Sequence, residues 1–132
     1  MIKKSHIIFY VEDQQKSTEF YSQLLNLKPT LNVPGMTEFH LSSTTVLGLM
    51  PARGIKKLLG DKIEQPEKKL GQPRGELYLL VNDIENYINR AATLGAKKLD
   101  DLKERNWGHR VIYFEDPDGY VIAIAEEIKR VD

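Results

Sequence analysis

Cysteine is absent from the 132 residues of this chain. Without thiols the chain has no disulfide, no thiol nucleophile and no cysteine-based zinc site, and this composition fits a reducing compartment. A surplus of basic charge is also absent, since 19 Lys and Arg residues balance 19 Asp and Glu residues. Because nucleic acids and anionic membranes bind basic surfaces, this balance argues against both classes of partner.

Long hydrophobic runs are also missing near the N-terminus, where the longest apolar run is residues 7–11. Such a run is too short for a signal peptide or a membrane span, so we expect a cytoplasmic protein. Hydrophobic residues still make up 41% of the chain, which is enough for the core of one domain.

Familiar catalytic signatures do not occur either: there is no GxSxG elbow, phosphate loop or GxGxxG fingerprint. The histidines are His6, His40 and His109, and no two of them have the helical spacing of a zinc protease. The sequence therefore names no catalytic residue, and whether the protein is an enzyme stays open.

An alternation of strand and helix patterns occurs twice along the chain. In the first half, residues 7–11 predict a strand, Asp13 a helix N-cap, and the spacing of the following apolar residues a helix. Two further strands are predicted at 36–41 and 45–50. In the second half, a strand is predicted at 77–81, then a helix that starts after Asp83 and ends at Gly95, and then two strands at 111–114 and 120–125.

A shift of seventy residues places Val11 on Val81 and Asp13 on Asp83, which indicates a structural repeat. We therefore predict an α+β fold in one domain, 1–132, with module one at 1–50 and module two at 76–132. The segment 51–75 is charged and rich in Pro and Gly, which predicts a linker arm with a short helix near 55–59.

Three segments carry a family resemblance: HIIFYVEDQQKSTEFYSQLLNL, ELYLLVNDIENYINRAATLGAKK and YFEDPDGYVIAIAEE. They resemble the vicinal oxygen chelate superfamily, which includes glyoxalase I, bleomycin-resistance proteins and ring-cleaving dioxygenases. The resemblance implies two tandem βαβββ modules that form a U-shaped mixed sheet around a ligand cup. It also implies a homodimer with a small-molecule ligand.

The same resemblance implies a place for a metal. Metal-dependent members take two ligands from the first strands of the modules, here His6 and Glu76, and two from the last strands, here Gly48 and Ala123. Neither Gly48 nor Ala123 has a donor atom in its side chain. We therefore expect no complete metal site and no cofactor, with a divalent metal at His6 and Glu76 as the alternative.

The alternation of side chains along a strand predicts which of them face the ligand. A type I turn at residues 116–119 pairs Tyr113 with Ala123. A loop one residue different would instead place Arg110, Ile112 and Phe114 inside. The predicted ligand-binding residues, including Trp107 from a polar loop, are His6, Glu38, His40, Met50, Glu76, Tyr78, Trp107 and Tyr113.

Five of these residues also have a purely structural interpretation. His6 would be a hydrogen-bonded strand histidine, Glu76 a solvated charge, and Trp107 an anchor for its own loop. Glu38 and His40 would be the polar side of a half-exposed strand.

Three hypotheses follow for the function. The first is a small-molecule binding protein of the glyoxalase/bleomycin-resistance type. The second is a metal-dependent lyase or isomerase that uses His6 and Glu76, and the third is a scaffolding module with a closed cup.

Overall fold

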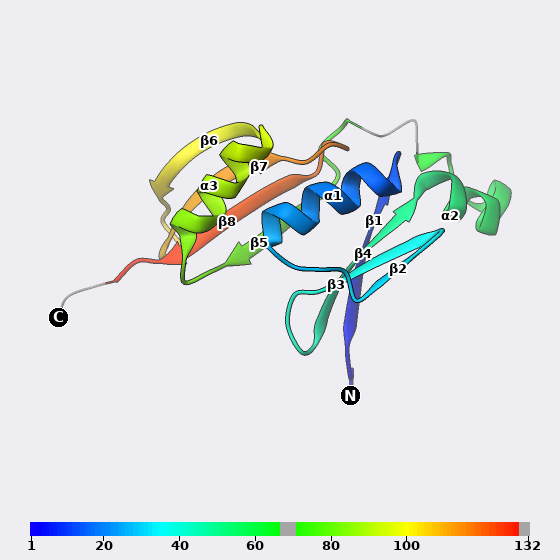
Figure 1. Ribbon diagram of the computed structural model, residues 1–132, viewed down its shortest axis with the longest axis horizontal. Helices are drawn as coiled ribbons and strands as arrows, with labels where there is room; N and C mark the ends of the chain where they lie inside the picture. The colour runs from blue at the N-terminus through cyan, green and yellow to red at the C-terminus, as the bar shows by residue number, and fades with distance from the viewer. Residues whose placement is uncertain (67–70, 130–132) are drawn as a thin grey trace. The chain divides into compact units, whose positions relative to one another are not determined.

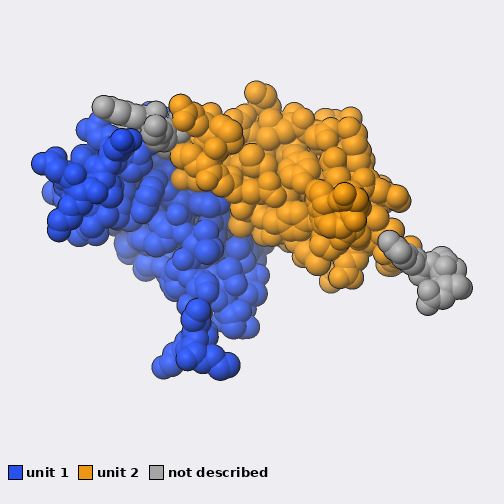
Figure 2. Space-filling view, turned by 180° about the vertical axis from the view of Figure 1, so that it is seen from behind, with its two compact units in different colours: residues 1–70 blue, residues 71–132 orange. Residues whose placement is uncertain are grey.

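The computed structural model describes residues 1–66 and 71–129, and the chain divides into two compact units, 1–70 and 71–132 (Figures 1 and 2). Positions 67–70, which belong to the predicted linker, lie outside the described residues. Each unit holds one four-stranded sheet with a helix between its first and second strands.

Unit 1 forms a sheet in the order β1-β4-β3-β2, in which β1 and β4 are parallel and the other pairs antiparallel. Its elements are β1 (Ser5–Val11), α1 (Gln14–Leu25), β2 (Leu31–Val33), β3 (Met36–His40), β4 (Thr45–Pro51), α2 (Ala52–Leu59) and a 3-10 turn, η1 (Gly60–Lys62).

Unit 2 repeats this order as β5-β8-β7-β6, again with the first and last strands parallel. Its elements are β5 (Glu76–Leu80), α3 (Ile84–Leu94), β6 (Lys97–Glu104), β7 (His109–Glu115) and β8 (Val121–Glu127). The equal strand order in both sheets confirms the predicted α+β fold with two βαβββ modules.

The helix of each module begins at the predicted residue, and the second helix also ends at the predicted glycine. The Asp13 side chain accepts a hydrogen bond from the Lys16 backbone N–H at the start of α1. Asp83 occupies the N-cap position of α3, and Gly95 ends that helix with φ +70°, a conformation that favours glycine.

One face of each sheet packs on its helix and forms the core. In unit 1 this face is buried at Phe9, Phe39 and Leu49, whereas Ile7 on the same side of β1 is 50% exposed. On this face, therefore, only the C-terminal half of β1 is shielded from solvent. In unit 2, α3 packs mainly against β8, where Ile122 and Ile124 are buried (Figure 1).

The first part of the predicted linker is ordered structure. Strand β4 runs to Pro51 and α2 follows directly, with Ala52 and Ile55 buried. The short helix predicted near 55–59 is thus confirmed, and it starts three residues earlier because buried apolar contacts extend it toward β4.

The residue patterns missed two strands, β2 and β6. All three residues of β2 are exposed, and six of the eight residues in β6 are Lys, Asp or Glu. Both strands lie at a sheet edge, where charged side chains are tolerated because one strand face and one backbone edge meet water. Neither strand therefore shows the apolar alternation of a half-buried strand.

Within residues 1–66 and 71–129, no helix combines the length and the apolar character that crossing a membrane requires.

Candidate functional site

The sheet face opposite the helix, here called the open face, carries the predicted site residues of each unit. On unit 1, strand pairing places Ile8, Gly48 and Glu38 in one row across β1, β4 and β3. His6, Val46 and His40 form the next row.

His6 and Glu38 lie together on this open face. The His6 Nδ1 atom is 3.2 Å from a Glu38 carboxylate oxygen, although the two residues belong to strands separated by β4. Adjacent strands are about 4.8 Å apart, so the two side chains meet by reaching across the intervening strand.

Gly48 lies on the strand between them, in the same row as Glu38. A Cβ atom at Gly48 would stand 3.1 Å from Ile8 Cγ1 and 3.4 Å from Met36 Sδ. Because glycine has no side chain, the space above β4 at this position is left to Ile8 and Met36.

The other two predicted residues of unit 1 are separate from this pair. His40 is exposed at the end of β3, on the far side of Val46 from His6. Met50 is half-buried beside Tyr10, near the other end of β4.

On unit 2, the open face holds the row Tyr78, Ala123 and Tyr113, on β5, β8 and β7. The Tyr113–Ala123 pairing confirms the register predicted from the turn at residues 116–119. In that turn the Asp116 carboxylate accepts hydrogen bonds from the backbone N–H groups of Asp118 and Tyr120. Ala123 is fully buried.

Three aromatic side chains form a hydrogen-bonded cluster on this face. Trp107 Nε1–H donates to the Tyr78 hydroxyl oxygen at 2.9 Å, and the same oxygen is 2.6 Å from His109 Nδ1. We call Trp107, Tyr78 and His109 the aromatic cluster. Trp107 is 53% exposed and Tyr78 is 37% exposed, so the cluster offers its rings to solvent.

The hydrogen bonds also determine what the cluster offers to a ligand. An indole N–H can only donate, so Tyr78 oxygen is the acceptor for Trp107. When the Tyr78 hydroxyl in turn donates to Nδ1, a neutral His109 carries its hydrogen on Nε2. The cluster then presents aromatic rings together with one imidazole N–H donor.

Tyr113 lies beside this cluster and packs on the buried residues Val111, Ala123 and Ala125. Burial raises the pKa of the Tyr113 hydroxyl, and the negative charge of Glu76 raises it further. Tyr113 is therefore a neutral hydrogen-bonding group at ordinary pH, and exposed Glu76 lies within its electrostatic reach.

Arg105 is a residue of this face that the sequence did not indicate. Its guanidinium lies 5.2 Å from the centre of the Tyr113 ring, and it donates to the Asp100 carboxylate and the Val111 carbonyl. Hydrogen bonds from Lys103, and then from Arg105, lower the pKa of Asp100 to about 2. No motif signals this arrangement, because it depends on a bulged pairing of β6 with β7.

The residues at the superfamily's metal positions do not supply a complete ligand set. Gly48 and Ala123 have no donor atoms, and His6 Nδ1 already faces Glu38. Within the described part of the chain, no group of three or more His, Cys, Asp or Glu side chains could hold a metal ion. The donors present therefore do not fit a four-ligand centre.

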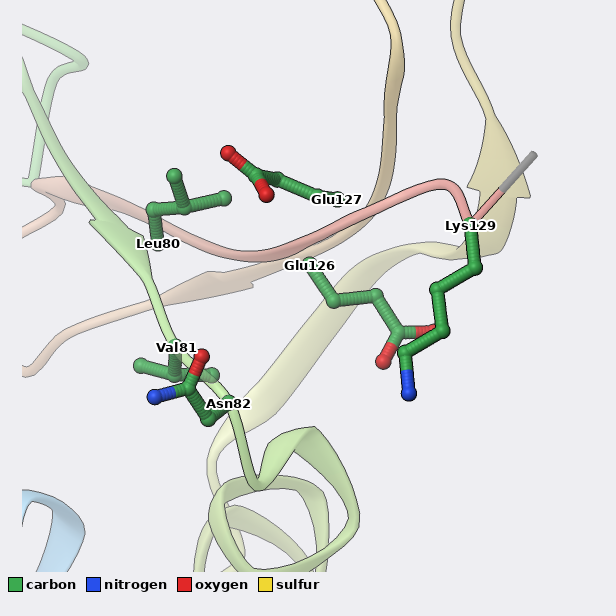
Figure 3. A pocket seen from close by; sticks show the side chains of 6 residues that line it. All are labelled: Leu80, Val81, Asn82, Glu126, Glu127 and Lys129. Carbon is green, nitrogen blue, oxygen red and sulfur yellow. The ribbon is translucent and has the colours of Figure 1, made fainter.

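A small cavity of about 240 Å³ lies elsewhere on unit 2, beside the ends of β5 and β8 (Figure 3). It is lined by Leu80, Val81, Asn82, Glu126, Glu127 and Lys129. None of the predicted ligand-binding residues lines it. The open faces carry most of the predicted residues, so they, rather than this cavity, are the candidate site.

Comparison with solved structures places the fold among known proteins. A protein of unknown function from Agrobacterium tumefaciens str. C58 is 24% identical, with a TM-score of 0.77 over 93% of this chain and 92% of that chain. A glyoxalase/bleomycin resistance protein/dioxygenase from Nocardioides is 18% identical, with a TM-score of 0.77 over 97% and 85%. A lactoylglutathione lyase from Agrobacterium tumefaciens is 17% identical, with a TM-score of 0.70 over 92% and 90%.

No curated protein matches the chain. At these identities the solved structures establish the fold alone. The family model of the glyoxalase-like domain, however, matches residues 4–129, nearly the whole sequence. The chain therefore belongs to the glyoxalase-like domain family, within the vicinal oxygen chelate superfamily.

Proposed function

We propose that the protein binds a small molecule with a flat aromatic part on the open face of unit 2, without a metal. The observation that carries this proposal is the aromatic cluster, in which Trp107, Tyr78 and His109 are joined by hydrogen bonds at 2.9 and 2.6 Å.

Exposed aromatic rings usually lose side-chain entropy when they bind a ligand. In the aromatic cluster much of that cost is already met, because each ring is held by a partner before binding. The Tyr78 and His109 ring centres are 5.8 Å apart with 39° between their planes. A flat ligand would stack on Trp107, worth about 0.5–1.5 kcal/mol beyond area burial.

The polar groups around the cluster define the complementary ligand. The His109 Nε2–H would donate to a carbonyl or ring nitrogen, and the neutral Tyr113 hydroxyl lies on the same face. Arg105 holds Tyr113 from the β6 side through its ring contact. The proposed ligand is therefore an aromatic or heteroaromatic compound with hydrogen-bond acceptors.

Fluorescence tests this proposal directly, since Trp107 is the single tryptophan of the chain. A panel of aromatic and heteroaromatic compounds, including glycopeptide drugs, would be titrated into protein kept in EDTA. We expect a compound that changes Trp107 emission and whose calorimetric affinity falls about fivefold or more in Trp107→Ala. Calorimetric binding with unchanged Trp107 emission would contradict the proposal.

A second function is a metal-dependent lyase or isomerase that uses His6 and Glu76. The observation in its favour is the presence of a donor side chain at both first-strand positions. Elemental analysis and titration with nickel, zinc and manganese separate the two functions. One tightly bound divalent ion per chain would support the second function and contradict a metal-free site.

We also propose that the protein is a homodimer, as relatives in the superfamily usually are. Each unit has a small core, and association would bury more apolar surface than either unit achieves alone.

A further inference from the structure

The open face of unit 1 differs in chemistry from that of unit 2. Its strand positions are mainly apolar, and Ile8 remains 40% exposed there. The described strand residues of this face include no Lys or Arg; they are His6, Ile8, Tyr10, Leu31, Val33, Met36, Glu38, His40, Val46, Gly48 and Met50. Glu38 is therefore the one acidic group among them.

The Glu38 carboxylate is the hydrogen-bond acceptor of the His6–Glu38 pair. The His6 Nδ1 atom lies 3.2 Å from one of its oxygens. The Glu38 carboxylate keeps further lone pairs, because two oxygens can accept about four hydrogen bonds. A ligand group that matches this pair must donate more than one hydrogen bond.

The charge of the face selects among such donors. Glu38 is 22% exposed in its side chain, so its charge is partly shielded from water and is not screened like a fully exposed one. A primary ammonium has three donors and the opposite charge, whereas an anion would be repelled. The apolar surface beside the pair, formed by Ile8 and Met36 over Gly48, suits an apolar body attached to the ammonium.

We infer that the open face of unit 1 binds the ammonium group of a small hydrophobic amine through His6 and Glu38. The inference rests on the proposed function in taking the protein to bind small molecules. Gly48 is part of this site, since a side chain there would press on Ile8 and Met36, which form its apolar surface.

The test compares benzylamine with benzyl alcohol, which has a similar shape but no charge. Both are titrated at about pH 8, where most histidine side chains are neutral, in EDTA so that no metal bridges ligand and protein. Affinity is followed by the backbone amide signals of Gly48 and Glu38 in two-dimensional NMR spectra. We expect benzylamine to bind about tenfold more tightly than benzyl alcohol.

Variants assign the preference to the pair. Glu38→Gln removes the charge with little change in shape and should bring the two affinities within about twofold of each other. His6→Ala should weaken benzylamine binding about threefold or more, because the Glu38 carboxylate loses the neighbouring side chain that helps to hold it in place. Glu19→Gln, on α1 of the same unit, is the matched control and should leave the preference unchanged.

Equal affinities for amine and alcohol in the native protein would overturn the inference, as would an unchanged preference in a folded Glu38→Gln variant. Benzylamine shifts confined to the indole of Trp107 would also overturn it, while leaving the proposed function intact. Conversely, a Glu38-dependent preference together with no response of Trp107 to any aromatic compound would support this inference and contradict the proposed function.

Discussion

Replacing Tyr78 with phenylalanine tests the aromatic cluster most sharply, because one atom joins all three side chains. The Tyr78 oxygen accepts from Trp107 at 2.9 Å and lies 2.6 Å from His109 Nδ1. Tyr78→Phe keeps the ring and removes only this oxygen, so both hydrogen bonds are lost while the packing of the ring remains.

The size of the effect follows from exposure. A hydrogen bond contributes about 0.5–1.5 kcal/mol to the free energy of unfolding, so two bonds set a range of about 1–3 kcal/mol. Trp107 and Tyr78 are 53% and 37% exposed, so water can replace the lost partner and no buried polar group is left unpaired. We therefore expect a loss near the lower end, about 1 kcal/mol, and a fall in melting temperature of about 4 °C.

The assay is the fluorescence anisotropy of Trp107, read beside chemical denaturation. Freed from Tyr78, the indole should rotate more and its steady-state anisotropy should fall, while ligand affinity weakens because the ring is no longer held in place. Tyr87→Phe is the matched control: it changes a tyrosine on α3 whose ring lies against Arg90, away from the cluster. Unchanged anisotropy in Tyr78→Phe, or a loss of stability above about 3 kcal/mol, would refute the reasoning.

Three further predictions concern backbone, charge and assembly. Gly119 and Gly35 have similar φ values of +90° and +98°, but of the two only Gly119 has backbone close by, with a Cβ there standing 2.6 Å from the Gly71 carbonyl carbon. In chemical denaturation, Gly119→Ala should therefore lose at least about 1 kcal/mol more stability than Gly35→Ala, and equal losses would contradict the close contact. The hydrogen bond from Lys103 is the main cause that lowers the Asp100 pKa from 3.8 to about 2. The Asp100 carboxylate therefore contributes to stability above pH 3.8, and this contribution is lost as the pH falls through 2. NMR titration of the Asp100 carboxyl should find that low midpoint, and an ordinary midpoint would contradict the contact with Lys103. Light scattering should give about twice the chain mass of 15.2 kDa at micromolar concentration, and the mass of one chain would count against the homodimer.

The sequence predicted those parts of the fold whose residues alternate between a buried and an exposed face. Phe9 and Val11 are buried as the alternation of β1 requires, and the turn before Tyr120 was sufficient to set the register of β7 and β8. Edge strands β2 and β6 could not be found in this way, because an exposed edge places no demand on hydrophobic pattern.

The candidate site likewise contains contacts that the sequence predicted and contacts that it could not predict. Placing Tyr113 opposite Ala123 needed the turn type together with strand parity, and the sequence contains both. The contact of His6 with Glu38 could not be predicted, since it crosses a whole strand and depends on how β1, β4 and β3 pair. Arg105 was missed for a similar reason, because irregular pairing of β6 directs it to Tyr113.

The two units show why a shared fold does not carry a shared site. Their helix-facing positions must fill a core and therefore remain apolar in both, as Phe39 and Ile122 illustrate. Positions on the open face are not packed against the helix and differ between the units: strand pairing places His6 and Glu38 of unit 1 at the positions that Glu76 and Tyr113 hold in unit 2. The open faces of the two units therefore differ in chemistry although the units share one fold.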